Sequence, residues 1–283
     1  MTTRTLFQAL AWARARLVAV GIAETEAAID AALYARTILG WDRARLAAEQ
    51  HHAAPAGLEP QFSAWVARRE RREPSAYIVG VREFWGLDFT VTPSVLIPRP
   101  ETEFIVEEAL RVVRGQERIA DIGTGSGCVA VALAHDCGGC RVVASDVSAE
   151  ALEVARANAI RHAVADRVTF VHTSYLDRVD GPFDVITANP PYVKDGDKPA
   201  LALAVRHEPE VALFGGAGGL RDIGGVLDAA AAKLGPGGWL FMEFGYDQED
   251  DVAALVARHR ELRLVRVRDD LQGIPRTAII HRE

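Results

Sequence analysis

The sequence predicts an α/β protein in which a mainly parallel, doubly wound sheet follows a small helical domain. Two patterns lead to this prediction. After Glu101, short apolar runs alternate with longer segments of helical periodicity, as strands alternate with the helices that join them. Before about residue 75, apolar residues recur every three or four positions, and no strand-like run interrupts them.

Residues 1–75 are expected to form the helical domain. Apolar positions follow a helical spacing at Leu6, Leu10, Ala13 and Leu17. A further helix is predicted from Ser63 to Arg72, and it ends in a basic cluster formed by Arg68, Arg69, Arg71 and Arg72. We interpret this cluster as a solvent-exposed helix face, and a contact with ribosomal RNA or an acidic partner is the alternative.

Residues 76–100 are expected to link the helical domain to the sheet domain. The segment from Phe84 to Val91 has the pattern of a β-hairpin or of an extended stretch. Pro93, Pro98 and Pro100 then stiffen the chain, which indicates a domain boundary in this region.

Residues 101–283 carry the alternating pattern of the sheet domain. Helices are predicted over residues 104–113, 128–135, 149–161, 220–233 and 249–259. Strands are predicted over residues 118–122, 140–145, 168–172, 183–188, 239–244, 262–267 and 277–281. Because no helix separates the last two strands, we expect them to form an antiparallel edge of the sheet.

The composition excludes several classes of protein. Residues 1–100 hold 12 Lys+Arg and 10 Asp+Glu (+2), so the net charge of −7 leaves 20 and 29 (−9) for the remainder. An acidic sheet domain argues against a tight, sequence-independent grip on DNA, which needs many phosphate contacts. No apolar stretch approaches the ~20 residues that span a bilayer, and no signal-peptide pattern opens the chain. We expect a cytoplasmic monomer that binds neither membranes nor DNA directly.

Cys137 and Cys140 form the one Cys-x-x-Cys pattern of the sequence. A zinc site would need two further ligands, and none is spaced suitably. We therefore interpret the segment as a plain loop and expect no metal, with a redox pair or a metal site as the alternatives.

A glycine-rich turn directly follows the first predicted strand of the sheet domain. Gly123, Gly125 and Gly127 lack a Cβ, so their backbone allows a ligand to come close, and the next helix offers free N–H groups. A dinucleotide fingerprint requires a further glycine where Cys128 stands, which disfavours a pyrophosphate. Asp121 precedes the turn and could orient the loop or a ligand ammonium group.

Polar residues follow the next three strands as well: Asp146, then Ser174 and Tyr175, then Asn189. Ligands of open α/β sheets bind beyond the carboxyl ends of the strands, and Asp146 can accept both hydroxyls of a ribose. The pattern thus predicts a nucleoside ligand, with a tight turn and an unrelated strand-end acid as the alternative. The predicted contacts are Asp121, Gly123, Thr124, Gly125, Ser126, Gly127, Asp146, Ser174, Tyr175 and Asn189.

The tetrapeptide Asn189-Pro190-Pro191-Tyr192 ends the fourth strand, because two prolines cannot continue a ladder. It suits a planar NH2 group, whose two hydrogens the Asn189 side-chain oxygen and the Pro190 carbonyl would accept while Tyr192 walls the pocket. With the glycine turn, it predicts an S-adenosylmethionine-dependent methyltransferase that acts on a planar nitrogen. Asn189, Pro190 and Tyr192 are the expected catalytic residues; a rigid loop that caps the strand is the alternative.

With these residues in view, the chain resembles the HemK/PrmC-type release factor glutamine methyltransferases. The resemblance covers most of the sequence, and the most specific segments are residues 82–87, 96–103 and 183–192, followed by Glu208-Pro209 and the glycines of 215–219. It implies a helical N-terminal domain, a hairpin linker and a Rossmann-like methyltransferase domain. It also implies methylation of the glutamine side-chain nitrogen in the Gly-Gly-Gln motif of class 1 peptide chain release factors, with S-adenosylhomocysteine as the other product.

The resemblance also suggests which residues hold the peptide and where this chain departs from the family. Pro191, Arg82, Phe84 and Glu208 join Asn189, Pro190 and Tyr192 as expected substrate contacts, and interdomain packing is the alternative for the linker residues. Ser174 stands where the family often has an acid near the adenine amino group, so its contact lacks charge assistance. Glutamine methylation of a ribosomal protein and amino-methylation of adenine in nucleic acid are the alternative activities.

Overall fold

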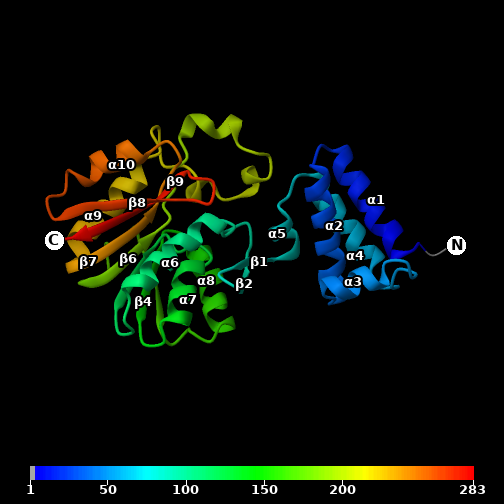
Figure 1. Cartoon of the computed structure of the whole chain (residues 1–283), viewed down its shortest axis with the longest axis horizontal. Coiled ribbons are helices and arrows are strands. Elements are labelled where there is room, and N and C mark those ends of the chain that lie inside the picture. The colour runs from blue at the N-terminus through cyan, green and yellow to red at the C-terminus, as the bar shows by residue number, and fades with distance from the viewer. Residues whose placement is uncertain (1–3) are drawn as a thin grey trace. The chain divides into compact units, whose positions relative to one another are not determined.

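The computed structural model describes residues 4–283 of the chain. The chain forms two compact units, which Figure 1 shows from blue at the N-terminus to red at the C-terminus. The first unit consists of the described residues up to Gly80 together with Leu203–His207, and the second consists of Val81–Ala202 and Glu208–Glu283. In the part of the chain that is described, no helix is long and apolar enough to cross a bilayer.

The first unit is helical, as the periodicity predicts. Its helices are α1 (Leu6–Ala19), α2 (Glu24–Leu39), α3 (Arg43–Glu49), α4 (Glu59–Glu70) and α5 (Ser75–Val79). Thr5 caps α1 through a capping box with Gln8, and Gly40 ends α2 in the left-handed conformation. The core between the helices is apolar and includes Leu6, Leu17, Tyr34, Phe62 and Val66.

The arginines at the end of α4 are not all exposed to solvent, because two of them pair with acids of the first unit. Arg69 is buried, and its Nε donates to Asp30 Oδ2 at 2.7 Å while its guanidinium also pairs with Glu26. Arg68 pairs with Glu73. The interpretation as a solvent-exposed helix face is therefore wrong for Arg69, whose charge is satisfied by acids of α2.

The second unit begins with a hairpin of β1 (Val81–Phe84) and β2 (Leu87–Thr90). Its strands are β3 (Arg118–Ile122), β4 (Arg141–Asp146), β5 (Val168–His172), β6 (Phe183–Ala188), β7 (Leu234–Glu243), β8 (Leu262–Asp269) and β9 (Pro275–Arg282). Its helices are α6 (Glu103–Val112), α7 (Cys128–Asp136), α8 (Ala149–Arg161), α9 (Arg221–Lys233) and α10 (Glu249–Val256). Four short 3₁₀ helices join them, η1 (Pro100–Thr102), η2 (Asp195–Ala200), η3 (Val205–His207) and η4 (Glu210–Ala212), of which η3 belongs to the first unit.

Strands β3 to β9 form one sheet in the order β5-β4-β3-β6-β7-β9-β8. The first five strands of that order are parallel, whereas β9 is antiparallel to both β7 and β8. The predicted fold class is confirmed, and so is the antiparallel end, although β9 lies inside the sheet and β8 is the edge.

Helices cover both faces of this sheet (Figure 1). Successive residues of a strand point to opposite faces, so Ile119 packs in the core under α6, α7 and α8 while Ala120 packs in the core under α9 and α10. A strand covered on both faces is mostly apolar, and in β6 every residue except Asp184 is buried.

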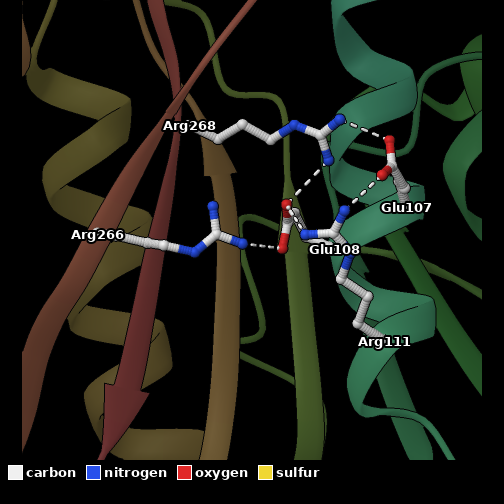
Figure 2. A network of polar contacts seen from close by, with 5 residues as sticks. All are labelled: Glu107, Glu108, Arg111, Arg266 and Arg268. Atoms are coloured by element: carbon white, nitrogen blue, oxygen red, sulfur yellow. Dashed lines mark hydrogen bonds and ion pairs between the residues drawn. The ribbon is translucent and has the colours of Figure 1, made fainter.

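A network of charges fastens β8 to α6, as Figure 2 shows. Glu108 of α6 is 3% exposed and accepts hydrogen bonds from Arg111, Arg266 and Arg268. Glu107 pairs with Arg268 and Arg111 beside it. The antiparallel end of the sheet is thus tied to a helix more than 150 residues earlier in the chain.

Candidate active site

The carboxyl ends of β3, β4 and β6 open onto one cavity of the second unit. Most of the residues that the sequence predicts for ligand binding line it, namely Asp121, Gly123, Thr124, Gly125, Ser126, Asp146, Ser174, Tyr175, Asn189, Pro190 and Pro191. The cavity wall is completed by residues that include Ser94, Arg99, Thr102, Ser148, Thr173, Arg221 and Asp222. Parallel strands bring these distant segments together because their carboxyl ends share one edge of the sheet.

The glycine turn forms a cradle at the end of β3. Gly123, Gly125 and Gly127 all have positive φ, between 56° and 80°, which L-residues with a Cβ rarely adopt. A Cβ at Gly123 would meet nothing within 4 Å, so its backbone stays open to a ligand. A Cβ at Gly127 would lie 3.0 Å from the Cβ of Ala155, so this glycine instead allows α7 and α8 to pack closely.

Asp121 holds the cradle in shape from below. Its carboxylate accepts the hydroxyl of Thr124 at 2.6 Å and that of Thr187 at 2.8 Å. Burial raises the pKa of Asp121 to about 6, because the charged form loses its hydration and the two hydroxyls and the backbone N–H of Ala130 offset this only in part. The expected role of orienting the loop agrees with these contacts.

Asp146 lies at the end of β4, beside the cradle. Its oxygens accept the backbone N–H of Gly125 at 2.8 Å and that of Ser148 at 2.9 Å, and burial raises its pKa. The two oxygens have four lone pairs between them, so the carboxylate can accept further hydrogen bonds. Two neighbouring ligand hydroxyls would match this pair of acceptors.

Tyr175 forms the wall beyond β5. Its hydroxyl donates to Asp222 of α9 at 3.0 Å, and burial together with that carboxylate raises the pKa of Tyr175 to about 12. The ring fits because Gly225 lies behind it, where a Cβ would come within 2.1 Å of the ring carbon Cζ. Ser174 lines the same part of the cavity, and Asp222 is the carboxylate that the sequence interpretation missed there.

The Asn-Pro-Pro-Tyr tetrapeptide is held at both of its ends. Asn189 Nδ2 donates to Thr102 Oγ1 at 3.0 Å, and Thr102 Oγ1 donates to Glu243 Oε2 at 2.6 Å. Tyr192 OH donates to the other oxygen of Glu243 at 3.0 Å, and this carboxylate is the first cause that raises the pKa of the Tyr192 hydroxyl. Tyr192 supports the tetrapeptide from behind and is not among the residues that line the cavity.

Thr102 and Glu243 are site residues that the sequence interpretation missed. Glu243 ends β7, so the rule that polar residues at carboxyl ends of strands gather at the site could have found it. Thr102 is the last residue of the 3₁₀ helix η1, in the Pro-Glu-Thr-Glu segment, where no strand or helix pattern points to its partner.

Three of the predicted peptide contacts, Arg82, Phe84 and Glu208, do not line the cavity. Arg82 is exposed on β1, and Phe84 is fully buried against Phe89, with ring centroids 6.0 Å apart. Glu208 is buried, accepts the N–H of Ile97 at 3.0 Å and pairs with Arg99. None of these three residues belongs to the cavity wall that the described part of the chain forms.

Cys137 and Cys140 are joined by a disulfide at the end of α7, with their Cα atoms 5.5 Å apart. The interpretation as a plain loop is therefore wrong for this pair, because a spacing of three residues allows the two sulfurs to meet. The Glu117 carboxylate lies close to both sulfurs, and its oxygens accept the backbone N–H groups of residues 114–116.

Two family models match the chain. The model described as PrmC N-terminal domain matches residues 8–80, and the model described as Methyltransferase small domain matches residues 101–213. The first match lies in the helical unit, and the second covers the part of the chain that contains β3 to β6.

Curated relatives match along nearly the whole chain. The release factor glutamine methyltransferase of Bradyrhizobium diazoefficiens is 41% identical over 257 residues, which are 89% of this chain and 86% of the relative. The release factor glutamine methyltransferase of Moorella thermoacetica is 39% identical, over 98% of this chain and 99% of the relative.

Solved structures share the fold of the sheet domain. A methyltransferase from Pyrococcus furiosus is 25% identical with a TM-score of 0.53, over 70% of this chain and 89% of that one. The catalytic domain of hMettl16 in complex with MAT2A 3'UTR hairpin 6 is 16% identical with a TM-score of 0.56, over 79% of this chain and 82% of that one. At this identity, the second likeness concerns the fold alone.

Proposed function

The chain belongs to the family of release factor glutamine methyltransferases, and from this premise we propose how its residues carry out the reaction. Its activity is the transfer of a methyl group to the side-chain amide nitrogen of a glutamine in a release factor. We place that glutamine in the Gly-Gly-Gln motif of class 1 release factors, because glycines without side chains can follow the glutamine into a narrow cavity.

We propose that the cavity at the carboxyl ends of β3, β4 and β6 holds S-adenosylmethionine. This ligand supplies a methyl group already activated on a positively charged sulfur. The residues present fit it: the Asp146 carboxylate keeps acceptor capacity for the ribose hydroxyls, and the open backbone at Gly123 allows close approach. Tyr175, with Ser174 and Asp222 beside it, offers a flat wall and polar acceptors for the adenine.

Asn189 and Pro190 are the proposed contacts of the glutamine amide. The nitrogen of an amide is a poor nucleophile because its lone pair is delocalised into the carbonyl, so the protein must mainly position it. Two acceptors, Asn189 Oδ1 and the Pro190 carbonyl, would hold both hydrogens of the NH2 group and favour positive charge as it develops there. Alignment of reacting atoms in this way contributes up to ~7–11 kcal/mol in favourable cases.

Glu208 supports this wall in our proposal, since it anchors the Ile97 backbone and the Arg99 side chain, and Arg99 lines the cavity. Arg82 and Phe84 stay predicted peptide contacts, with the packing of Phe84 beside Phe89 as the alternative for that residue.

The observation that carries the proposal is the placement of Asn189 and Pro190 beside the glycine cradle in one cavity. The test is incubation with S-adenosylmethionine labelled in its methyl group and one of three acceptors: a class 1 release factor, a ribosomal protein or DNA. Label should enter the release factor alone and should be lost when its Gly-Gly-Gln glutamine is replaced by alanine. Label in DNA or in the ribosomal protein alone would establish one of the alternative activities instead.

A further inference from the structure

The proposed reaction depends on which end of the Asn189 amide faces the acceptor nitrogen. The amide carries an oxygen that accepts hydrogen bonds and an NH2 that donates them, and the two ends have nearly the same size. Only the oxygen can hold a hydrogen of the glutamine NH2 group. A flipped amide would place a donor against a donor, so the enzyme needs a means of fixing this orientation.

Asn189 is connected to a buried carboxylate through one hydroxyl. Its Nδ2 bonds to Thr102 Oγ1, which bonds in turn to Glu243 Oε2, and the three residues come from the end of β6, from η1 and from the end of β7. Asn189 Oδ1 has no hydrogen-bond partner among residues 4–283. The amide is therefore tied at its nitrogen end, which leaves its oxygen available to a ligand.

The direction of this chain of hydrogen bonds follows from the charge of Glu243. Thr102 has a single hydroxyl hydrogen, and an ionised carboxylate can only accept it. Once that hydrogen is given to Glu243, the Thr102 oxygen can only accept, so Asn189 must turn its NH2 toward it. A protonated Glu243 could donate to Thr102 instead, and the hydroxyl hydrogen would then be free to bind Asn189 Oδ1.

Glu243 lies in surroundings that make its charge costly. It is 1% exposed, and no lysine, arginine or histidine forms an ion pair with it within the described part of the chain. Burial is the main cause that raises the pKa of Glu243, the hydroxyls of Thr102 and Tyr192 lower it, Glu101 raises it and Arg276 lowers it. Burial raises the pKa of the Cys128 thiol in α7 to about 12, and the charge of Glu243 contributes to this rise, so this thiol stays neutral.

We propose that Thr102 and Glu243 are positioning residues that hold the Asn189 amide with its oxygen toward the nitrogen to be methylated. The inference deepens the proposed function and rests on it. The same carboxylate binds Tyr192, so it fixes both the first and the fourth residue of the tetrapeptide. Loss of the charge of Glu243 removes the preference for the productive orientation.

The decisive variant is Thr102→Val, because valine has the shape of threonine and cannot relay a hydrogen bond. Thr277→Val is its matched control: Thr277 faces Glu243 in the ladder between β7 and β9, is equally buried, and its hydroxyl has no partner. With a release factor as acceptor, kcat should fall ~10- to 100-fold for Thr102→Val, as expected when one buried hydrogen bond is mismatched. Thr277→Val should leave kcat within about twofold, and Thr102→Ser should recover most of the loss.

A pH profile at saturating S-adenosylmethionine separates positioning from mere packing. In the natural protein, kcat should decline toward acid pH as Glu243 takes up a proton. Glu243→Gln should lose this decline, because a carboxamide takes up no proton in this range and its hydrogen bonds to Thr102 and Tyr192 do not change with pH. The amide protons of Asn189, followed by NMR in the protein labelled with ¹⁵N, should shift over the same pH range in the natural protein and stay constant in Glu243→Gln.

These measurements distinguish the possible failures. If the natural protein transfers methyl groups and Thr102→Val behaves as Thr277→Val does, the positioning role is wrong while the proposed function stands. An unchanged acid decline in Glu243→Gln would also overturn it. If no acceptor is methylated at all, the proposed function fails, and the NMR titration still decides: Asn189 amide protons that ignore pH in the natural protein would refute the role of Glu243.

Discussion

Glu108 and Glu243 are two glutamates of the second unit that are buried to nearly the same extent and satisfied in opposite ways. Glu108 receives hydrogen bonds from three arginines, so its charge is neutralised where it lies (Figure 2). Glu243 receives two hydroxyls and no ion pair from the described residues. The ion pairs of Glu108 join a helix to a strand. The charge of Glu243 is held by neutral donors and therefore costs stability. Because Glu243 is linked to Asn189 through Thr102, we assign it a role in the reaction.

The largest change in rate is expected at Asn189, the residue that Glu243 orients through Thr102. Asn189→Ala should lower methyl transfer by ~10³-fold, because one of two acceptors for the developing charge disappears. The rate is measured in single turnovers with a labelled methyl donor. Calorimetry should find donor affinity within a few-fold, since the substitution leaves Asp146, the proposed ribose contact, untouched. Transfer at near-normal rate would contradict the assignment.

Glu108→Ala should show the opposite pattern, a loss of stability with little change in rate. The substitution takes from Arg266 its Glu108 partner and leaves Arg268 with Glu107 alone, which should lower the free energy of unfolding by about 2 to 3 kcal/mol. Urea unfolding measures the loss. The exposed Arg263–Glu283 pair offers a control, since Glu283→Ala should cost less than about 1 kcal/mol. A Glu108→Ala protein as stable as this control would break the comparison.

Asp121 resembles Glu243, because it too is buried and accepts only hydroxyls from its side-chain partners. Its pKa is raised from 3.8 to about 6, so the ionised form is disfavoured in the folded protein. The Asp121 contribution to stability should therefore decrease as pH rises from about 4 to about 6, by ~2 kcal/mol. Urea unfolding at several pH values in this window gives the free energy of unfolding as a function of pH. This free energy should fall less steeply with pH in Asp121→Asn than in the natural protein. An equally steep fall in both proteins would show that Asp121 is ionised at no cost.

The smallest effect is expected from Ser174→Asp, which adds a carboxylate to the cavity wall for a bound ligand to contact. Ser174→Asp would offer the adenine amino group an acceptor with charge assistance and should tighten binding of S-adenosylmethionine ~3- to 10-fold. Ser174→Asn controls for side-chain size. Calorimetry measures both, and weaker binding of Ser174→Asp would show that repulsion from the nearby Asp222 outweighs the new contact.

Local patterns were sufficient to predict most of the fold. The predicted segments 118–122, 149–161, 168–172 and 183–188 coincide with β3, α8, β5 and β6. The carboxyl-end rule brought Asp121, Asp146 and Asn189 to one cavity because parallel strands share an edge.

Long-range pairs could not be predicted from the same patterns. Thr102 and Glu243 are 141 residues apart, and Arg266 and Glu108 are 158 residues apart. A side chain that makes such a pair looks like any other polar residue within its own helix or strand. The Cys137–Cys140 disulfide was missed for a related reason, since the spacing of two cysteines allows a loop, a metal site or a bond.

The narrow space between Gly225 and Tyr175 offers a route to reprogramming the enzyme. The aromatic ring occupies the volume that any side chain at position 225 would need, so the two positions can be redesigned as a pair. Tyr175→Ala would open a recess beside α9 that a synthetic donor with an enlarged adenine could fill and the natural donor could not. Such a variant could tag release factors selectively in a living cell, using chemistry that the cell's other methyltransferases do not accept.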